Sequence, residues 1–164
     1  ECWEIALKSH NTPSVIALSR QKVPYINPQN SKKNKCENGA YTVHITSHES
    51  NVTLLASGTE LELALKVQEK LKENNIHSKV VSMPCMELFD KQSKEFKEDI
   101  IEESSLVVTL EAGSITHWHK YIKNKGLNLG IDKFGESAPY KEVYDHFNLT
   151  EEKITSLIQK KLRE

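Results

Sequence analysis

Arg20 follows directly on an apolar run and has the most suggestive chemistry in the chain. The run "SVIALS" (14–19) is typical of a strand buried on both faces, and the arginine comes at its carboxyl end, where α/β proteins bind ligands. A guanidinium group matches a phosphate as a bidentate hydrogen-bond donor. An exposed arginine paired with a nearby carboxylate is nevertheless the more ordinary case. Residue type alone therefore leaves Arg20 open between anion binding and plain surface charge.

A second candidate is the turn "ASGTE" (56–60), which joins a strand to the start of a helix. Free backbone N–H groups at a helix start can cradle a phosphate. However, one glycine does not make a P-loop, and the GxGxxG pattern is absent. Thr59 and Glu62 match a capping box, so we expect a tight, capped turn. A small anionic regulator bound at Ser57–Glu60 is the alternative.

The segment "EAGSITHWHKY" (111–121) holds a carboxylate and two histidines. On a helix, His117 and His119 would point about 200° apart, so they are not expected to share a metal ion. Glu111 ends a strand, where α/β proteins carry functional residues. An acid in front of a helix also accepts backbone N–H groups, and we expect that capping role for Glu111.

The cysteines offer no evident chemistry. Cys85 follows a strand without an assignable base or cation nearby, so we expect an inert, packed thiol. Cys2, Cys36 and Cys85 are odd in number and far apart in sequence. This argues against a disulfide framework and a CxxC metal site, and it fits a reducing cytoplasm.

Composition excludes several classes of function. With 22 basic and 23 acidic residues the net charge is −1, which gives no bulk attraction to nucleic acid or anionic membranes. No apolar run approaches the roughly 18 residues of a spanning helix. The first ten residues are acidic and amphipathic, unlike a signal peptide. The residues alone show no complete catalytic set and no metal-ligand cluster.

The elements that must position these residues alternate between strands and helices. Alternating apolar residues predict a half-exposed strand at 41–45, and apolar runs predict strands at 52–56, 78–83 and 105–111, with a short candidate at 127–132. Helical spacing predicts helices near residues 3–10, 59–75, 86–92, 117–124, 140–147 and 151–162. This order implies right-handed βαβ units. The fold class is therefore α/β, a three-layer sandwich with a mostly parallel central sheet.

Apolar stripes show which helix faces should be buried. Leu61, Ala64, Val67 and Leu71 form one stripe, and Trp3, Ala6, Leu7 and His10 fall at helical spacing near the start of the chain. In the last helix the stripe is Ile154, Leu157, Ile158 and Leu162, with Thr150 as N-cap.

Residues 21–40 are rich in proline, asparagine and lysine and nearly without periodicity, which is typical of a linker. The chain starts without methionine and already in a helical pattern. We therefore expect a piece of a longer protein.

Taken together, six motifs resemble the C-terminal third of the transketolase family in order and spacing. They are "LSRQ" (18–21), "ASGTE" (56–60), "VSMPCMELFDKQ" (81–92), "EAGS" (111–114), Trp118 followed by "KY" (120–121), and "GIDKFGESAP" (130–139). The first and last favour transketolase over related thiamine diphosphate enzymes. The resemblance implies three parts: residues 1–23 end the pyrimidine-binding middle domain, 24–40 are a linker, and 41–164 are the C-terminal domain.

The resemblance also implies an activity. Transketolases move a two-carbon ketol unit from a ketose phosphate to an aldose phosphate, with thiamine diphosphate and a divalent metal, Mg or Ca. The catalytic glutamate, substrate-facing histidines and Gly-Asp-Gly cofactor motif lie upstream in the family, and this sequence has no Gly-Asp-Gly. No catalytic, cofactor or metal residue is therefore expected in this chain, which alone should be inactive.

In transketolases the arginine of the first motif binds the phosphate end of the sugar substrate, and this favours the functional interpretation of Arg20. By resemblance the parent is a cytoplasmic homodimer with sugar-phosphate substrates, binding neither nucleic acid nor membranes. Two features depart from the family: His117 and His119 replace small or polar residues, and the linker is unusually rich in lysine and asparagine. A purely structural role for the domain stays open as an alternative.

Overall fold

A computed structural model describes residues 1–26, 33–122 and 126–164 of the chain. Part of the linker and the end of the helix expected at 117–124 lie outside these residues. The strands are β1 (Tyr41–Ile45), β2 (Val52–Ala56), β3 (Ser78–Ser82), β4 (Leu106–Leu110) and β5 (Leu127–Leu129). The α-helices are α1 (Cys2–Lys8), α2 (Glu60–Glu73), α3 (Met86–Asp90), α4 (Lys94–Ile100), α5 (Tyr140–His146) and α6 (Glu151–Lys161). Two 3-10 helices are η1 (Lys35–Asn38) and η2 (Thr116–Tyr121).

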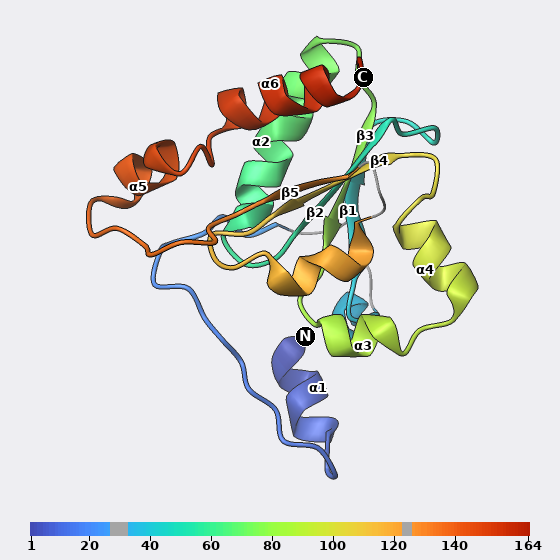
Figure 1. Ribbon diagram of the computed structural model, residues 1–164. Helices are drawn as coiled ribbons and strands as arrows, with labels where there is room; N and C mark the ends of the chain where they lie inside the picture. Colours follow the sequence, from blue (N-terminus) through green and yellow to red (C-terminus); the bar gives the residue numbers. More distant parts are fainter. Residues whose placement is uncertain (27–32, 123–125) are drawn as a thin grey trace.

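The five strands form one sheet in the order β1-β3-β2-β4-β5. Strands β2 to β5 run parallel, and only β1 is antiparallel to its neighbour β3. Helices α2 and α6 lie side by side on one face, while α3, α4 and η2 cover the other (Figure 1). The predicted class, α/β with a mostly parallel sheet between helical layers, is confirmed.

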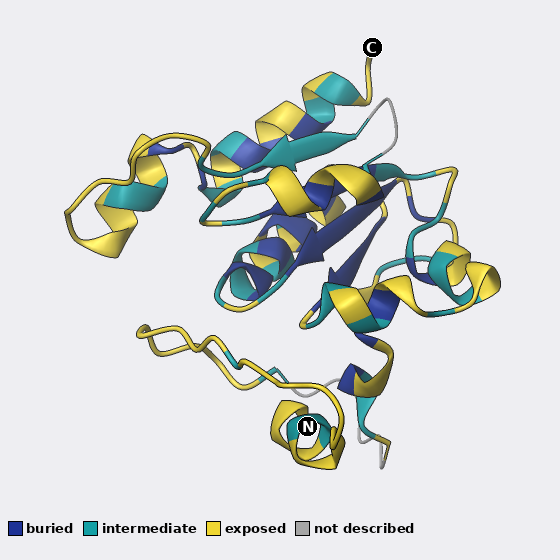
Figure 2. Cartoon of the chain, turned by 60° about the horizontal axis from the view of Figure 1, so that its bottom comes forward, coloured by how far each residue is buried: buried dark blue, intermediate teal, exposed yellow. Residues whose placement is uncertain are grey.

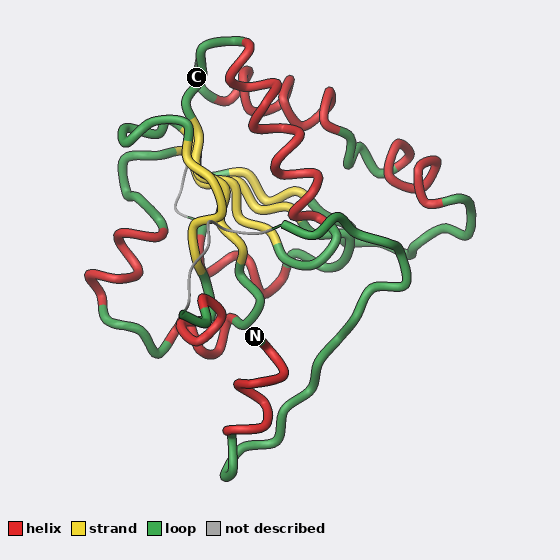
Figure 3. Tube along the Cα trace, turned by 180° about the vertical axis from the view of Figure 1, so that it is seen from behind, coloured by secondary structure: helices red, strands yellow, loops and turns green. Residues whose placement is uncertain are grey.

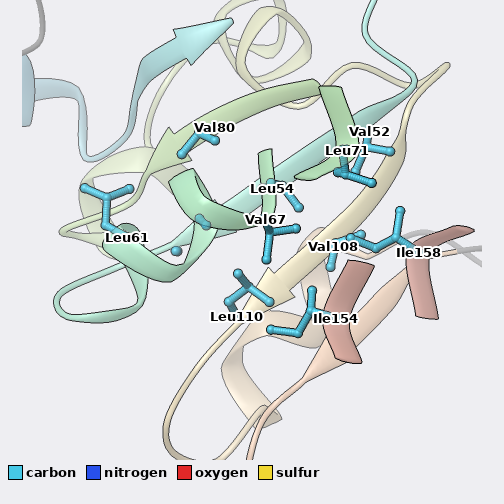
Figure 4. Packing of buried hydrophobic residues seen from close by; sticks show 12 residues of the cluster. Val52, Leu54, Leu61, Val67, Leu71, Val80, Val108, Leu110, Ile154 and Ile158 are labelled. Carbon is cyan, nitrogen blue, oxygen red and sulfur yellow. The ribbon is translucent and has the colours of Figure 1, made fainter. Parts of the chain in front are cut away.

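The α2–α6 face holds the larger core. Alternate residues of β2 point to it, and the whole strand is buried, as expected for a central parallel strand. The predicted α2 stripe packs there. Figure 4 shows these side chains meeting the strand residues and those of α6. The cluster is Val52, Leu54, Ala56, Leu61, Ala64, Val67, Leu71, Val80, Val108, Leu110, Ile154 and Ile158.

Aromatic residues fill the opposite face. Trp118 of η2 is fully buried and packs edge-on to Tyr121, whose ring in turn meets Phe89 of α3. The Tyr121 hydroxyl donates to Asp90 Oδ1 at 2.8 Å. These side chains lie on the side of the sheet opposite α2 and α6. Figure 3 shows helices on both sides of the sheet, seen from behind. Since η2 is a 3-10 helix, the helix expected over 117–124 is tighter than predicted in its described part.

The N-terminal segment, residues 1–26, differs from expectation. Residues 13–19 form no strand, and Val15 and Leu18 are 95% and 76% exposed. Helix α1 forms as predicted, but none of its residues is buried. Figure 2 shows the segment as an exposed arm beside the sheet. A strand needs a neighbour for its backbone N–H and C=O groups, and none of the described strands pairs with this run.

Two helix starts also differ in detail. Thr59 already has a helical conformation, and its hydroxyl donates to Glu60 Oε1 at 2.6 Å, so the predicted capping box is wrong. Glu62 pairs instead with Lys66 at 2.7 Å. Thr150 does stand at the N-cap of α6, but its side chain forms no capping bond.

The stripe of α6 is narrower than predicted. Ile154 and Ile158 are buried, whereas Leu157 and Leu162 are 40% and 41% exposed. Thr155 is buried in their place, and its hydroxyl donates to the Glu151 carbonyl at 2.7 Å. The helix rests on α2 by one edge, so only the residues nearest that edge lose contact with solvent.

Candidate functional site

A crevice lies at the carboxyl ends of β2 and β4. Strand β2 continues through α2 toward β3, and β4 continues through η2 toward β5, so the two connections leave in opposite directions along the sheet. Open α/β sheets bind ligands at such switch points. A cavity of about 730 Å³ lies there. Its polar lining comes from four parts of the chain and includes Arg20, Thr59, Glu60, Glu111, Tyr140 and Tyr144.

Glu60 is the most enclosed carboxylate of the crevice. It is 5% exposed, at the first position of α2. Its Oε1 atom accepts the Thr59 hydroxyl and also the hydroxyl of Tyr144 from α5. Burial and the bond to Glu60 raise the pKa of Tyr144, so this phenol stays protonated and acts as a donor at neutral pH.

Glu111 lies across the crevice, and its predicted role as a backbone cap is wrong. Its Oε2 atom accepts the indole N–H of Trp118 at 3.0 Å. The short helix that follows is 3-10 and buries Trp118, which brings the indole to the carboxylate. Burial is the largest influence and raises the pKa of Glu111; the Trp118 bond partly opposes this, and the charge of Glu60 adds to it.

Arg20 reaches this crevice from the N-terminal segment. It is exposed and lines the same cavity as Glu60 and Glu111. Within the described ranges no carboxylate forms an ion pair with it. The local carboxylate partner of an ordinary surface arginine is therefore not found there, and the guanidinium group faces a cavity rather than a fixed partner.

The Ser57–Glu60 turn offers poor conditions for an anion. The backbone N–H groups of Glu60 and Leu61 donate to the carbonyls of Ser57 and Gly58 at 3.2 and 3.4 Å. Two acidic residues occupy the first turn of α2, and Glu111 lies opposite. The positive end of the helix dipole is thus already matched by carboxylates of this chain.

The remaining sequence candidates lie elsewhere. His117 and His119 are both exposed on η2, on either side of buried Trp118. Cys85 is half-buried, and its thiol contacts Glu87 Oε2 at 3.5 Å. Burial raises the pKa of Cys85, which agrees with an unreactive thiol. The described residues hold no group of three or more histidines, cysteines or carboxylates arranged for a metal ion.

Sequence reasoning missed the bond between Glu60 and Tyr144. Glu60 was visible only as part of a helix start, and Tyr144 only as part of a predicted helix. Their meeting depends on where α5 lies relative to the start of α2, because the two residues are 84 positions apart in the chain. A charged residue at the start of an otherwise apolar helix face is the one signal that could have drawn attention to Glu60.

A second cavity, of about 830 Å³, lies at the opposite, amino ends of the strands, beside Asn51 and Leu106. It lies away from Arg20 and from the carboxylates of the crevice. We therefore place the candidate site in the crevice at the carboxyl ends.

The fold and crevice define a three-layer α/β domain with its polar groups gathered at the carboxyl ends of parallel strands. The profile of the family described as "Transketolase-like TK C-terminal domain" matches residues 39–150. The transketolase of Aquifex aeolicus is 36% identical over 97% of this chain and 23% of its own length. The chloroplastic transketolase of Solanum tuberosum is 38% identical over 94% of this chain and 21% of its own.

A solved structure gives the same result. The transketolase from Pichia stipitis in complex with sedoheptulose-7-phosphate matches with a TM-score of 0.89 and 28% identity, over 99% of this chain and 23% of that one. The chain belongs to the transketolase family. It spans about a quarter of the length of these relatives. Of the helices that the structure describes, none is long and apolar enough to cross a membrane.

Proposed function

We propose that this chain is the C-terminal part of a transketolase and that Arg20 binds the phosphate of its sugar substrate. The observation that carries this proposal is the position of Arg20: exposed, at the switch-point crevice, and without an ion-pair partner among the described residues. A guanidinium group so placed offers two parallel N–H donors to a phosphate. The Pichia stipitis relative is described in complex with a sugar phosphate.

The remainder of the reaction belongs to other parts of the parent enzyme. The described residues lack a metal-binding cluster, and the sequence lacks a Gly-Asp-Gly motif, so they do not fit a metal-bound thiamine diphosphate. We place the cofactor and a divalent metal, Mg or Ca, outside this chain. Residues 1–23 then complete the middle domain, 24–40 link it, and 41–164 support the active site and the dimer.

The 164-residue chain alone is accordingly expected to show no ketol transfer and to bind no thiamine diphosphate. Mixing it with cofactor, metal and sugar phosphates tests this directly. Measurable turnover would show that the chemistry resides here after all. The near-neutral charge gives no bulk attraction to nucleic acid or anionic membranes, which supports small-molecule substrates. A cytoplasmic location remains part of the proposal, and relatives with chloroplastic names exist. Localisation of the tagged full-length protein checks the compartment.

Arg20→Ala in the full-length enzyme tests the phosphate role. Loss of a charge-assisted bidentate contact costs about 1.5–3 kcal/mol, so KM for phosphorylated substrates should rise by about tenfold to a few hundredfold. KM for an unphosphorylated ketose donor should be the same in Arg20→Ala and in the unaltered enzyme, because that donor has no phosphate for Arg20 to bind.

The matched control is Arg20→Lys, which keeps the positive charge but loses the two parallel donors of the guanidinium group. Its KM for phosphorylated substrates should lie between those of the unaltered enzyme and Arg20→Ala. If KM rises equally for phosphorylated and unphosphorylated donors, Arg20 supports the fold of the site rather than binding phosphate. If KM is unchanged for both, Arg20 is ordinary surface charge and the domain has a structural role.

A further inference from the structure

The sequence contains one Asn-Gly pair, Asn38-Gly39, which lies just before β1. Asparagine is a chemically labile residue, and a following glycine favours its deamidation, because glycine has no Cβ to hinder the approach of its backbone nitrogen to the asparagine side chain. Asn38 is the last residue of η1 and is exposed. Residue type and exposure therefore predict rapid loss of the Asn38 side-chain amide.

The backbone around Gly39 opposes this reaction. The Gly39 N–H group donates to the Cys36 carbonyl at 2.9 Å, across η1. Gly39 has a φ of +80°, the left-handed conformation that glycine commonly adopts after a helix. To close a planar five-membered ring with the Gly39 nitrogen, Asn38 must leave its helical conformation and the N–H bond to Cys36 must break. Deamidation therefore requires η1 to open.

Gly39 is also packed against the start of α3. It is buried, and its carbonyl accepts the backbone N–H of Cys85 at 3.1 Å. A Cβ atom added to Gly39 would overlap the backbone of Cys85 and of Phe89. The next residue, Ala40, has no exposed surface. The contact between Gly39 and α3 therefore leaves no room for a longer backbone.

We propose that Asn38 is a deamidation site that the fold protects, and that formation of isoaspartate there breaks the contact between Gly39 and α3. When η1 opens, the Gly39 nitrogen attacks the side-chain amide carbon of Asn38. A C–N bond forms, the amide nitrogen leaves as ammonia with the Gly39 proton, and a succinimide remains. Water then opens the ring at either carbonyl and gives aspartate or isoaspartate, without any change in oxidation state.

Isoaspartate differs from aspartate in the path of the backbone. In isoaspartate the main chain runs through the side-chain carbon, so it is one atom longer immediately before Gly39. The contacts that carry this inference join Gly39 to Cys36 and to Cys85, and none of them involves residues 1–23. The inference is therefore independent of the proposed role of Arg20, and either can fail without the other.

Incubation of the 164-residue chain in buffer and in urea, at the same pH and temperature, tests the protection. Peptide mapping by mass spectrometry measures the loss of the Asn38 amide with time. The rate should be at least about tenfold slower in buffer than in urea, because only the opened fraction of the folded chain reacts. A synthetic peptide of residues 34–41 in both solutions corrects for the effect of urea on the chemistry. Equal corrected rates would overturn the proposal.

Two variants test whether opening of η1 controls the rate. The Asn34 Oδ1 atom accepts the Cys36 N–H at 3.0 Å and caps η1. Asn34→Ala should therefore speed deamidation in buffer by about twofold to thirtyfold, as expected for loss of an N-cap, and should have no effect in urea. Glu4→Ala is the matched control, because it removes the bond from Asn34 Nδ2 but keeps the cap. An unchanged rate in Asn34→Ala, or an equal increase in Glu4→Ala, would overturn the proposal.

The isoaspartyl product tests the effect on the fold. The protease Asp-N cleaves before aspartate but not before isoaspartate, so it identifies the isoaspartyl chain after ageing. Hydrogen exchange of the Cys85 amide, followed by NMR, should be faster in that chain, because its acceptor is the Gly39 carbonyl. Asn38→Asp adds the same charge without lengthening the backbone and should exchange as the unaltered chain does. Slow exchange of Cys85 in the isoaspartyl chain would contradict the proposal.

Discussion

Two leucines in similar apolar runs have opposite environments in this chain. Leu18 in "SVIALS" is 76% exposed, whereas Leu54 in "VTLLA" is fully buried. Strand β2, which carries Leu54, lies between β3 and β4 and beneath α2. The run that carries Leu18 has no strand beside it among the described residues. The difference therefore comes from the neighbours and not from the local sequence.

The comparison shows what can be concluded from an apolar run. Such a run indicates that the segment is buried in its complete fold, because both its side chains and its backbone groups need partners. The sheet domain contains those partners, and its predicted strands form. The N-terminal segment has no such partners among the described residues. The transketolases that the chain matches are more than four times as long as the chain.

The largest expected effect on the free energy of unfolding comes from truncating the buried leucine of this pair. Leu54→Ala should lower the free energy of unfolding by about 2–5 kcal/mol, because it leaves a cavity in a core with no solvent access. Leu18→Ala should change it by less than about 0.5 kcal/mol, as for other exposed positions. Urea denaturation of each variant measures the difference.

The same pair sharpens the comparison in the full-length enzyme. If the N-terminal segment belongs to a middle domain, Leu18→Ala should destabilise that longer protein clearly more than it does this chain. Equal, small effects of Leu18→Ala in both would mean that the segment remains exposed, and that its apolar pattern has another cause.

A smaller effect is expected at two carboxylates that pair with lysines, one in each region. Lys79 of β3 is almost completely buried, and its Nζ atom donates to Glu102 at 2.6 Å and to the Asp99 carbonyl at 2.7 Å. Glu102→Gln should cost about 1.5–3 kcal/mol, since a buried ammonium loses its charged partner.

Glu4→Gln is the matched control in the N-terminal segment. Glu4 pairs with Lys8 at 2.7 Å, and both side chains are largely exposed. Surface pairs contribute little, so no measurable loss is expected in chemical denaturation. A loss as large as that of Glu102→Gln would mean that the N-terminal segment folds cooperatively with the sheet domain.

Much of the fold is predictable from sequence because its signals are local. The buried runs of β2 and β4 and the stripe of α2 are explained by periodicity alone. The crevice is less predictable, because its contacts join distant positions. Nothing near Glu111 in the sequence indicates that its partner is the Trp118 indole rather than a backbone N–H, since that depends on how tightly η2 turns.

A still smaller effect is expected from Glu111, in the pH dependence of the free energy of unfolding. Burial, with a contribution from the charge of Glu60, raises the pKa of Glu111 above its ordinary value of 4.5 in the folded chain. Between these two values the folded state binds a proton that the unfolded chain has lost. The contribution of Glu111 to the free energy of unfolding therefore falls as pH rises from about 4.5 upward, following linkage.

Glu111→Gln should remove this contribution while its amide oxygen still accepts the Trp118 N–H. Relative to the unaltered chain, the variant should gain stability between pH 4 and pH 7, as measured by urea denaturation at each pH. Glu62→Gln, in the first turn of α2 and without a bond to Trp118, is the control. A variant that instead loses stability across this range would show that the Glu111 carboxylate stabilises the fold.

The smallest expected effect is a null result at the Ser57–Glu60 turn. Titration of the ¹⁵N-labelled chain with inorganic phosphate should leave the amide resonances of Ser57 to Glu60 in place, because carboxylates already occupy this helix start. Saturable shifts there would revive an anionic regulator. Shifts confined to Arg20 and Gln21 would instead locate phosphate at the guanidinium group. The two sides of the crevice would then differ in what they bind. The start of α2 would exclude anions because of its carboxylates, and the side formed by the N-terminal segment would bind them through Arg20.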